Sequence, residues 1–417
     1  MSPFLVAALV ALNLGMIFLL LAAPIGVRTI VLKARIAAPR MRLWNALYPL
    51  GVDAGWSGEI QSAEPIGEDG ALARIRLSWE GRDGKPIERK VRLSDVVEGQ
   101  HYAMQVADDS SLDVAFWADY REENSIDESD GASLVTLRRT DRYRGLAFPI
   151  FRFFIMRREL SRLKEWAETG AFVRRRLFER PITQVGFAVL SALILWPLFG
   201  LTHLGLMLSC VLTAVVALHE LGHMAAFRVM GHRKVRMIFI PLLGGIAIGG
   251  RPYDSRFEVA FVALMGAGFS AFLIPIAIAS SKMAGGYGHP AAAAVLAALV
   301  GIAALFNIAN LVPVWKFDGG QVLRQIFPGQ LTLAIMSFLT LSAFLALGSL
   351  AGLSTGFLAI TGIVFAILSL ITTGSGVKPR YELRPLVGFE RIALGAAFAA
   401  VFAVHSYGVM WAIGLLS

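Results

Sequence analysis

The chain has 417 residues, 39 Lys and Arg against 30 Asp and Glu, and a single cysteine, Cys210. A mean hydropathy of +0.63 and a hydrophobic content of 56% exclude an ordinary soluble protein and indicate an integral membrane protein. One cysteine excludes an intrachain disulfide and a thiolate metal cluster.

Apolar runs of about 20 residues, the length that crosses the hydrocarbon core, predict eight membrane-spanning helices. We expect them at residues 4–24, 182–201, 203–227, 257–281, 290–314, 330–350, 354–373 and 389–413. The polar stretch between the first two spans carries most of the chain's charge. The chain therefore divides into an N-terminal membrane anchor at 1–26, a soluble domain at 27–170, a basic linker at 171–180 and a membrane domain at 181–417.

The net charge of +9 is explained by membrane orientation, so we expect no nucleic-acid partner. When residues 27–180 are placed on the cytoplasmic side, Lys282 is the only Lys or Arg that falls outside, as the positive-inside rule requires. No Lys or Arg precedes Arg28, so the first span lacks the positive region of a cleaved signal peptide and is expected to be retained. We predict a protein of the bacterial inner membrane whose soluble domain faces the cytoplasm.

The soluble domain alternates polar and apolar residues in the pattern of an antiparallel sheet. We expect a strand at 30–37, a helix that begins at Pro39 and a long closing helix at 145–170. Further strands are expected at 73–80, 87–94, 101–108, 113–122 and 132–140. The predicted fold class is a polytopic α-helical membrane protein with a cytoplasmic α+β domain.

This order of elements resembles the helix-grip fold of the START and polyketide-cyclase superfamily, in which a curved sheet wraps the last helix around an apolar cavity. The resemblance implies a lipid or another apolar ligand in the cytoplasmic domain. Three tryptophans are candidates for the lining of such a cavity, although ordinary core packing explains them as well: Trp56, Trp79 and Trp117.

The third apolar run contains the sequence HELGH at residues 219–223. Positions i and i+4 share one face of a helix, so His219 and His223 can direct two imidazoles at one ion. HExxH on a helix is the arrangement of zinc hydrolases, in which the glutamate, here Glu220, is the general base. A carboxylate inside a membrane span costs at least about 2.5 kcal/mol, which favours a functional group over a hydrogen-bonded network that only ties helices together.

A catalytic zinc ion needs a third protein ligand. Asp318 is the best candidate because it lies where the fifth span reaches the cytoplasmic side, at about the depth of HELGH; alternatively, it caps the short helix that follows. Asn310 is a candidate for a hydrogen bond to substrate or to a ligand, or for one between helices. The remaining candidate histidines are expected to be solvated or interfacial: His203, His232, His289 and His405.

The apolar stretch at 234–250 is too short to cross the membrane. Its β-branched residues and the paired glycines Gly244 and Gly245 predict a β-hairpin that dips into the membrane. The edge of such a hairpin can receive an unwound substrate as an added strand. The alternative is a loop that packs over the site.

Together these residues resemble the site-2 protease family of intramembrane zinc metalloproteases, which pairs HExxH on one membrane helix with an Asn-x-x-Pro…Asp-Gly pattern on a later one. The second pattern is met by Asn310, Pro313, Asp318, Gly319 and Gly320. It departs at Trp315 and Phe317, where the family commonly has proline and leucine. The resemblance covers roughly residues 181–375 and implies a Zn²⁺ cofactor, Asp318 as the third ligand, Asn310 as a substrate-positioning residue, and membrane-anchored proteins as substrates.

The leading hypothesis is therefore a zinc metalloprotease that cuts membrane-anchored proteins to release them, with the cytoplasmic domain gating access to the site. The alternative is a non-catalytic membrane protein that binds or transports lipid and carries a structural metal site. Loss of function in Glu220→Gln would count against the alternative, because a structural site tolerates that change.

Overall fold

The computed structural model describes residues 15, 18–19, 22–67, 70–129, 131–171, 181–240, 244–314, 317–372 and 380–414. The chain divides into two compact units, Met1–Arg175 with Gly374–Glu382, and Arg176–Thr373 with Leu383–Ser417. Most of the predicted anchor at 1–26 and of the basic linker at 171–180 lies outside the described residues.

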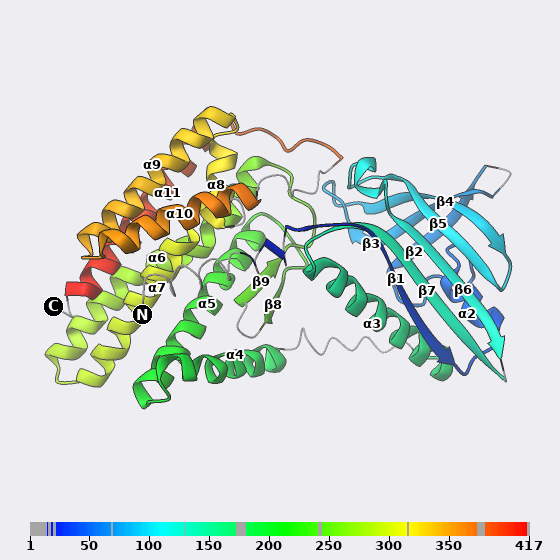
Figure 1. The fold of residues 1–417 in the computed structure, drawn as a ribbon, viewed down its shortest axis with the longest axis horizontal. Helices are drawn as coiled ribbons and strands as arrows, with labels where there is room; N and C mark the ends of the chain where they lie inside the picture. Colours follow the sequence, from blue (N-terminus) through cyan, green and yellow to red (C-terminus); the bar gives the residue numbers. More distant parts are fainter. Residues whose placement is uncertain are drawn as a thin grey trace. The chain divides into compact units, whose positions relative to one another are not determined.

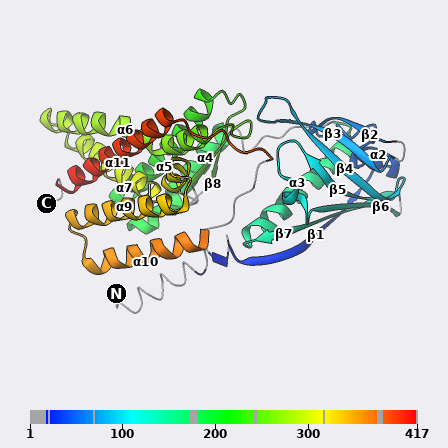
Figure 2. The same ribbon diagram turned by 90° about the horizontal axis from the view of Figure 1, so that it is seen from above.

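The N-terminal unit is built on one antiparallel sheet. Its strands are β1 (Pro24–Ile36), β2 (Ile60–Ile66), β3 (Leu72–Glu80), β4 (Pro86–Val97), β5 (His101–Asp109), β6 (Arg121–Ser129) and β7 (Ala132–Arg144). They lie in the order β1-β7-β6-β5-β4-β3-β2, so the first strand pairs with the last. The helix α2 (Arg40–Leu47) follows β1, and the long helix α3 (Ala147–Thr169) follows β7 and lies against one face of the sheet (Figures 1 and 2). The predicted helix-grip-like arrangement is confirmed.

Two details of the predicted strands are wrong. β2 is an additional strand. The segment expected as a strand at 113–122 forms a 3-10 turn, η1 (Val114–Trp117), and joins β6 only at its last two residues, so most of β6 was not predicted. The turn begins because the Asp113 carboxylate accepts a hydrogen bond from the Ala115 N–H at 2.8 Å. A side-chain cap of this kind overrides the alternation of polar and apolar residues.

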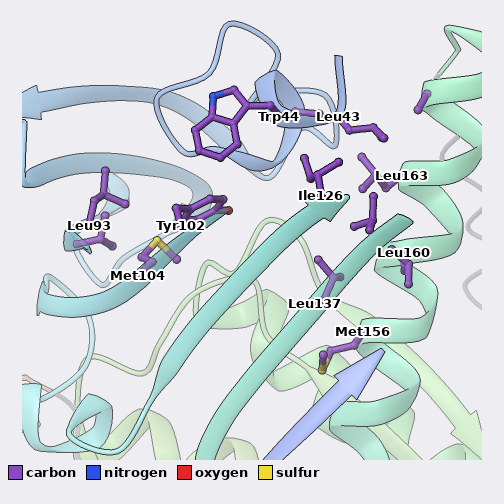
Figure 3. Packing of buried hydrophobic residues seen from close by; sticks show 14 of the residues in the cluster. Leu43, Trp44, Leu93, Tyr102, Met104, Ile126, Leu137, Met156, Leu160 and Leu163 are labelled. Carbon is purple, nitrogen blue, oxygen red and sulfur yellow. The ribbon is translucent and has the colours of Figure 1, made fainter. Parts of the chain in front are cut away.

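Apolar side chains fill the space between the sheet and α3 (Figure 3). Met156, Leu160 and Leu163 of α3 belong to the same buried cluster as Val135 and Leu137 of β7. These α3 positions are spaced three and four residues apart, and the β7 positions two apart, as a helix face and a strand face require. The domain therefore holds together through the pattern that the sequence predicts.

The three candidate tryptophans are placed in the core or on the surface. Trp56 packs on Trp166 with ring centroids 5.6 Å apart, and the Arg89 guanidinium lies 4.4 Å from the Trp117 ring. Trp79 is 49% exposed. Trp56 and Trp117 pack against the buried cluster of the domain.

A charged network interrupts this core. The Arg139 side chain is 6% exposed, and its guanidinium lies 3.0 Å from Glu122 Oε2 and 3.6 Å from Glu159 Oε1. It also donates a hydrogen bond of 2.7 Å to Asn124 Oδ1, while the Tyr120 hydroxyl donates to Glu122. Burial pushes the pKa of Arg139 down, but the two glutamates outweigh burial and raise it. The cation is therefore held charged by acceptors on several sides.

A short segment far along the chain also belongs to the N-terminal unit. The Arg380 N–H donates to Ser111 O at 3.1 Å, and its guanidinium pairs with Asp108. Arg82 Nη1 donates to Tyr381 O at 2.7 Å. The sequence predicts only a loop between two spans here.

The C-terminal unit is mainly helical. Its helices are α4 (Pro181–Leu195), α5 (His203–Val229), α6 (Arg256–Gly286), α7 (Pro290–Asn310), α8 (Asp318–Ile326), α9 (Gln330–Leu350), α10 (Thr355–Thr372) and α11 (Gly388–Gly414), with a 3-10 turn, η3 (Trp196–Phe199), after α4. The strands β8 (Arg236–Ile240) and β9 (Gly244–Ile248), which follow α5 and precede α6 along the chain, pair with each other in antiparallel orientation (Figure 1).

Six segments of the described chain are long and apolar enough to cross a membrane: Ile182–Phe199, His203–Val229, Arg256–Gly286, Pro290–Asn310, Gln330–Leu350 and Gly388–Gly414. They correspond to six of the eight predicted spans. The span expected at 354–373 coincides with α10, of which the described side chains form the apolar helix Thr355–Ile367, and the one at 4–24 lies mostly outside the described residues.

Candidate metal centre

Three side chains from two distant parts of the C-terminal unit converge on one point. His219 and His223 lie one turn apart on α5, and Asp318 is the first residue of α8. Asp318 Oδ2 lies 3.0 Å from His219 Nε2 and 3.4 Å from His223 Nε2, and the two Nε2 atoms are 3.1 Å apart. The structure thus brings together the three residues that the sequence singles out as metal ligands.

The outer nitrogen of each imidazole has its own partner. His219 Nδ1 lies 2.7 Å from Asn307 Oδ1, and His223 Nδ1 lies 2.7 Å from Val262 O. A carbonyl oxygen only accepts, so Nδ1 of His223 carries a proton; Asn307 Nδ2 already donates to Ala303 O, which leaves Oδ1 as the acceptor for His219. In the neutral form of each imidazole, Nε2 therefore carries a lone pair on the side of Asp318, the usual preparation of a histidine ligand.

This arrangement fits a zinc ion. Two lone pairs and a carboxylate oxygen face one another, and Asp318 Oδ2 is buried without a hydrogen bond from the described residues. Buried acceptors without a donor are costly, so a cation between them removes the penalty. With zinc bonds of about 2.0–2.1 Å, tetrahedral ligand atoms are roughly 3.3 Å apart, close to the separations observed.

Glycines let neighbouring helices approach the cluster. A Cβ on Gly266 of α6 would lie 2.6 Å from His219 Nε2 and 2.6 Å from His223 Cε1. A Cβ on Gly319 would lie 1.9 Å from the Leu311 carbonyl oxygen. The bare backbone at these two positions is therefore what allows α6 to pack on the imidazoles and α8 to begin beside α7.

Glu220 lies beside the hairpin. Its carboxylate is largely buried and accepts a hydrogen bond from the Ala247 N–H of β9. A Cβ on Gly245 would lie 2.2 Å from Glu220 Cγ, so no larger residue fits there. Alternate residues of an antiparallel strand point their backbone groups away from the partner strand, so Gly245 faces the same side as Ala247. The two antiparallel strands expected within 234–250 are confirmed, and Gly244 pairs with Ile240.

The asparagine that contacts the candidate metal ligand His219 is Asn307, whereas the sequence singled out Asn310, one turn later on α7. Asn310 Nδ2 donates to Phe306 O of its own helix at 3.0 Å, while Asn307 is fully buried and holds His219. An asparagine inside an apolar helix signals a polar partner, but this signal applies to Asn307 and Asn310 alike and does not choose between them. Asp318 does not occupy the N-cap of α8, which is Phe317, so the capping explanation is not observed.

The other candidate histidines lie away from the cluster. His203 begins α5 and His289 precedes α7, both exposed as expected. His232 and His405 are instead buried, so the expectation that they are solvated is wrong. His232 Nε2 lies 2.6 Å from Glu258 Oε1, and His405 Nε2 donates to Ala267 O at 3.0 Å. Each has found a structural partner.

No family model matches the chain, and no curated protein matches its sequence. Among solved structures, the Aha1 dimer from Colwellia psychrerythraea is 14% identical with a TM-score of 0.28, covering 34% of this chain and 98% of that chain. A START superfamily protein from Mycobacterium smegmatis is 12% identical with a TM-score of 0.26, covering 34% and 99%. A protein from Staphylococcus saprophyticus is 18% identical with a TM-score of 0.27, covering 35% and 96%. Each of these three similarities concerns about a third of this chain.

Proposed function

We propose that this protein is an intramembrane zinc metalloprotease that hydrolyses peptide bonds of membrane-anchored proteins. The observation that carries the proposal is the convergence of Asp318, at the start of the short helix α8, with His219 and His223 on α5, a helix of membrane-spanning length and composition. Soluble zinc hydrolases do not need an apolar helix around HExxH, so the setting points to substrates that lie in the membrane.

The side chains divide the chemistry between them. His219, His223 and Asp318 would hold Zn²⁺, which supplies Lewis acidity toward a carbonyl oxygen and lowers the pKa of water. Glu220 takes the proton of the attacking water and returns it to the leaving amine nitrogen. Asn307 and the Val262 carbonyl hold the two imidazoles in the tautomer that turns Nε2 inward.

The edge of β9 is the proposed binding site for the substrate backbone. Gly245 and Ala247 direct backbone groups to the side on which Glu220 lies. An unwound substrate segment that adds to this edge would place its peptide groups beside the general base. Substrates that weaken helix locally, for example through Gly or Pro, are therefore expected to be cut best.

Zinc content of the purified full-length protein tests the ligand set. We expect about one zinc per chain in wild type and in His289→Ala, a control that removes an exposed histidine. His219→Ala and Asp318→Ala are expected to lose most of the zinc. Full zinc in Asp318→Ala would remove this residue from the ligand set.

Cleavage of single-span membrane reporters tests the reaction. Glu220→Gln should retain zinc and lose cleavage by on the order of 10²-fold or more, because the base is removed and the ligands are untouched. A zinc-loaded wild type with no cleavage, or a Glu220→Gln variant with full function, would favour a structural metal site in a lipid-binding or transport protein.

A further inference from the structure

The first half of α3 exposes a run of apolar side chains. Six of them are between 37% and 65% exposed: Phe148, Ile150, Phe151, Phe153, Phe154 and Ile155. The second half of the same helix is different, since it buries Leu160 and Leu163 and exposes polar residues such as Ser161 and Lys164. The core of the domain therefore accounts for the second half of α3 and leaves this apolar face without a partner among the residues of the unit that the structure describes.

The start of α3 is tied to the end of the N-terminal apolar segment. The Gly145 N–H donates to Ala23 O at 2.7 Å, and the Leu146 N–H donates to Leu19 O at 3.0 Å. The sequence up to Ala23 is apolar and about long enough to cross the hydrocarbon core. A span that ends there emerges at the membrane surface, and these hydrogen bonds hold the start of α3 at the same level.

The apolar face of α3 has the amino-acid composition expected at the membrane surface. Aromatic residues are favoured at the boundary between headgroups and acyl chains. Residues 148–155 rise only about 11 Å along the helix axis, so the whole face lies within the interfacial layer if the helix runs along the surface. Arg157 and Arg158 follow directly and are exposed, where cations meet anionic headgroups.

We propose that the first half of α3 docks on the lipid surface of the membrane, with its phenylalanines in the boundary layer and Arg157 and Arg158 facing anionic headgroups. The domain is then held at the membrane by two elements, the apolar segment before β1 and this helix face. The inference rests on the membrane setting of the proposed function and is independent of the metal chemistry.

Fluorescence quenching by lipids tests the docking in the full-length protein. Cys210→Ser removes the single cysteine, and Phe151→Cys or, as a matched control, Ser161→Cys supplies one labelling site on α3. Labelled with bimane, the protein is reconstituted into phosphatidylcholine vesicles with a minority of phosphatidylglycerol. We expect quenching at residue 151 at least about twofold stronger than at residue 161, and strongest for a doxyl group near the headgroup, because interfacial helices bury only roughly 5–10 Å into the boundary.

Every other pattern overturns the proposal. Solvent-like emission at residue 151 would leave the face in water, and blue-shifted emission without lipid quenching would mean that protein covers it. Equal quenching at both sites would remove the preference for the first half of α3. Phe154→Cys repeats the measurement if the first variant fails to accumulate, and a zinc chelator should leave the quenching unchanged, which separates this result from the fate of the metal site.

Discussion

In the N-terminal unit, hydrogen-bond acceptors surround a buried cation, the Arg139 guanidinium. In the C-terminal unit, three groups that can accept, the side chains of His219, His223 and Asp318, face one another. Arg139 is met by Glu122, Glu159 and Asn124, and the network is complete without any added group. In the metal centre proposed above, the two imidazoles present lone pairs to Asp318, and a bound cation balances these acceptors. Burial alone does not distinguish the two clusters, because both are buried. The number of hydrogen-bond donors relative to the number of acceptors does distinguish them.

Breaking the complete network should give the largest effect on stability. Arg139→Met removes the buried cation from the partly buried carboxylates of Glu122 and Glu159 and should lower the free energy of unfolding of the N-terminal unit by up to about 3–5 kcal/mol. The exposed neighbour Arg138, which lies 3.7 Å from Glu123, is the control, and Arg138→Met should cost less than about 1 kcal/mol. Hydrogen exchange at the β6 and β7 amides measures both. Equal protection in the two variants would contradict a structural role for the buried network.

Filling the space behind the imidazoles should come next. Gly266→Ala places a methyl group 2.6 Å from His219 Nε2 and should lower zinc affinity by roughly 10–100-fold, as loss of support around a metal site does. Gly268→Ala is the matched control, because its Cβ would meet the flexible Met265 side chain at 3.3 Å and Val401 Cγ2 at an ordinary contact distance of 3.9 Å. Competition with a zinc chelator gives the affinity. An unchanged affinity in Gly266→Ala would mean that α6 does not hold the imidazoles in place.

A third variant is expected to disturb the general base, Glu220, without disturbing the candidate metal ligands. Gly245→Ala would press on Glu220 and should slow reporter cleavage by roughly tenfold or more, equivalent to about 1.4 kcal/mol, while zinc content stays the same. Gly395→Ala adds a methyl group in open space on α11 and should have no effect. Loss of zinc together with cleavage in Gly245→Ala would show that the hairpin supports the ligands as well as the base.

The smallest effect is expected at the segment that returns to the N-terminal unit. Burial raises the pKa of Asp108, but hydrogen bonds and charge from Lys90 and Arg380 outweigh burial and hold it below its ordinary value. Ionised Asp108 therefore stabilises the unit above the unfolded pKa of about 3.9, and this stabilisation is lost as pH falls through the lower folded value.

Arg380→Ala should cost less than about 1 kcal/mol at pH 7, because the pair is partly solvated, and should flatten the loss of stability below about pH 4. Acid titration followed by tryptophan fluorescence measures it. Arg384→Ala, which removes a pair with Glu390 in the other unit, is the control. An unchanged acid transition in Arg380→Ala would assign the pH dependence to other carboxylates.

Features set by local spacing were predictable from the sequence. The i, i+4 relation fixes His219 and His223 on one face of α5, and the order of spans brings Asp318 to the same depth. Alternation predicted β1, β3, β4, β5 and β7, but it missed β2 and most of β6, since the strand expected at 113–122 overlaps β6 only at its last two residues. Hairpin glycines predicted β8 and β9, although the close approach of Gly245 to Glu220 required the structure.

Features set by packing between elements were not predictable. Asn307 rather than Asn310 faces His219, and the choice depends on the rotation of α7 against α5. Gly266 matters only because α6 crosses α5 at the imidazoles. The contacts of Arg380 join parts of the chain about 270 residues apart, for which the sequence holds no local signal.

Residues 380–382 contact the N-terminal unit although they are synthesised long after the rest of it. This has a consequence for folding during translation. The sheet and α3 are complete once residue 169 has left the ribosome, but the bonds to Ser111 and Arg82 wait for residues made some two hundred positions later. At 5–20 residues per second, that delay is roughly 10–40 s. During this interval the nascent domain must keep its fold without its last segment, while the helices of the second unit are still being made.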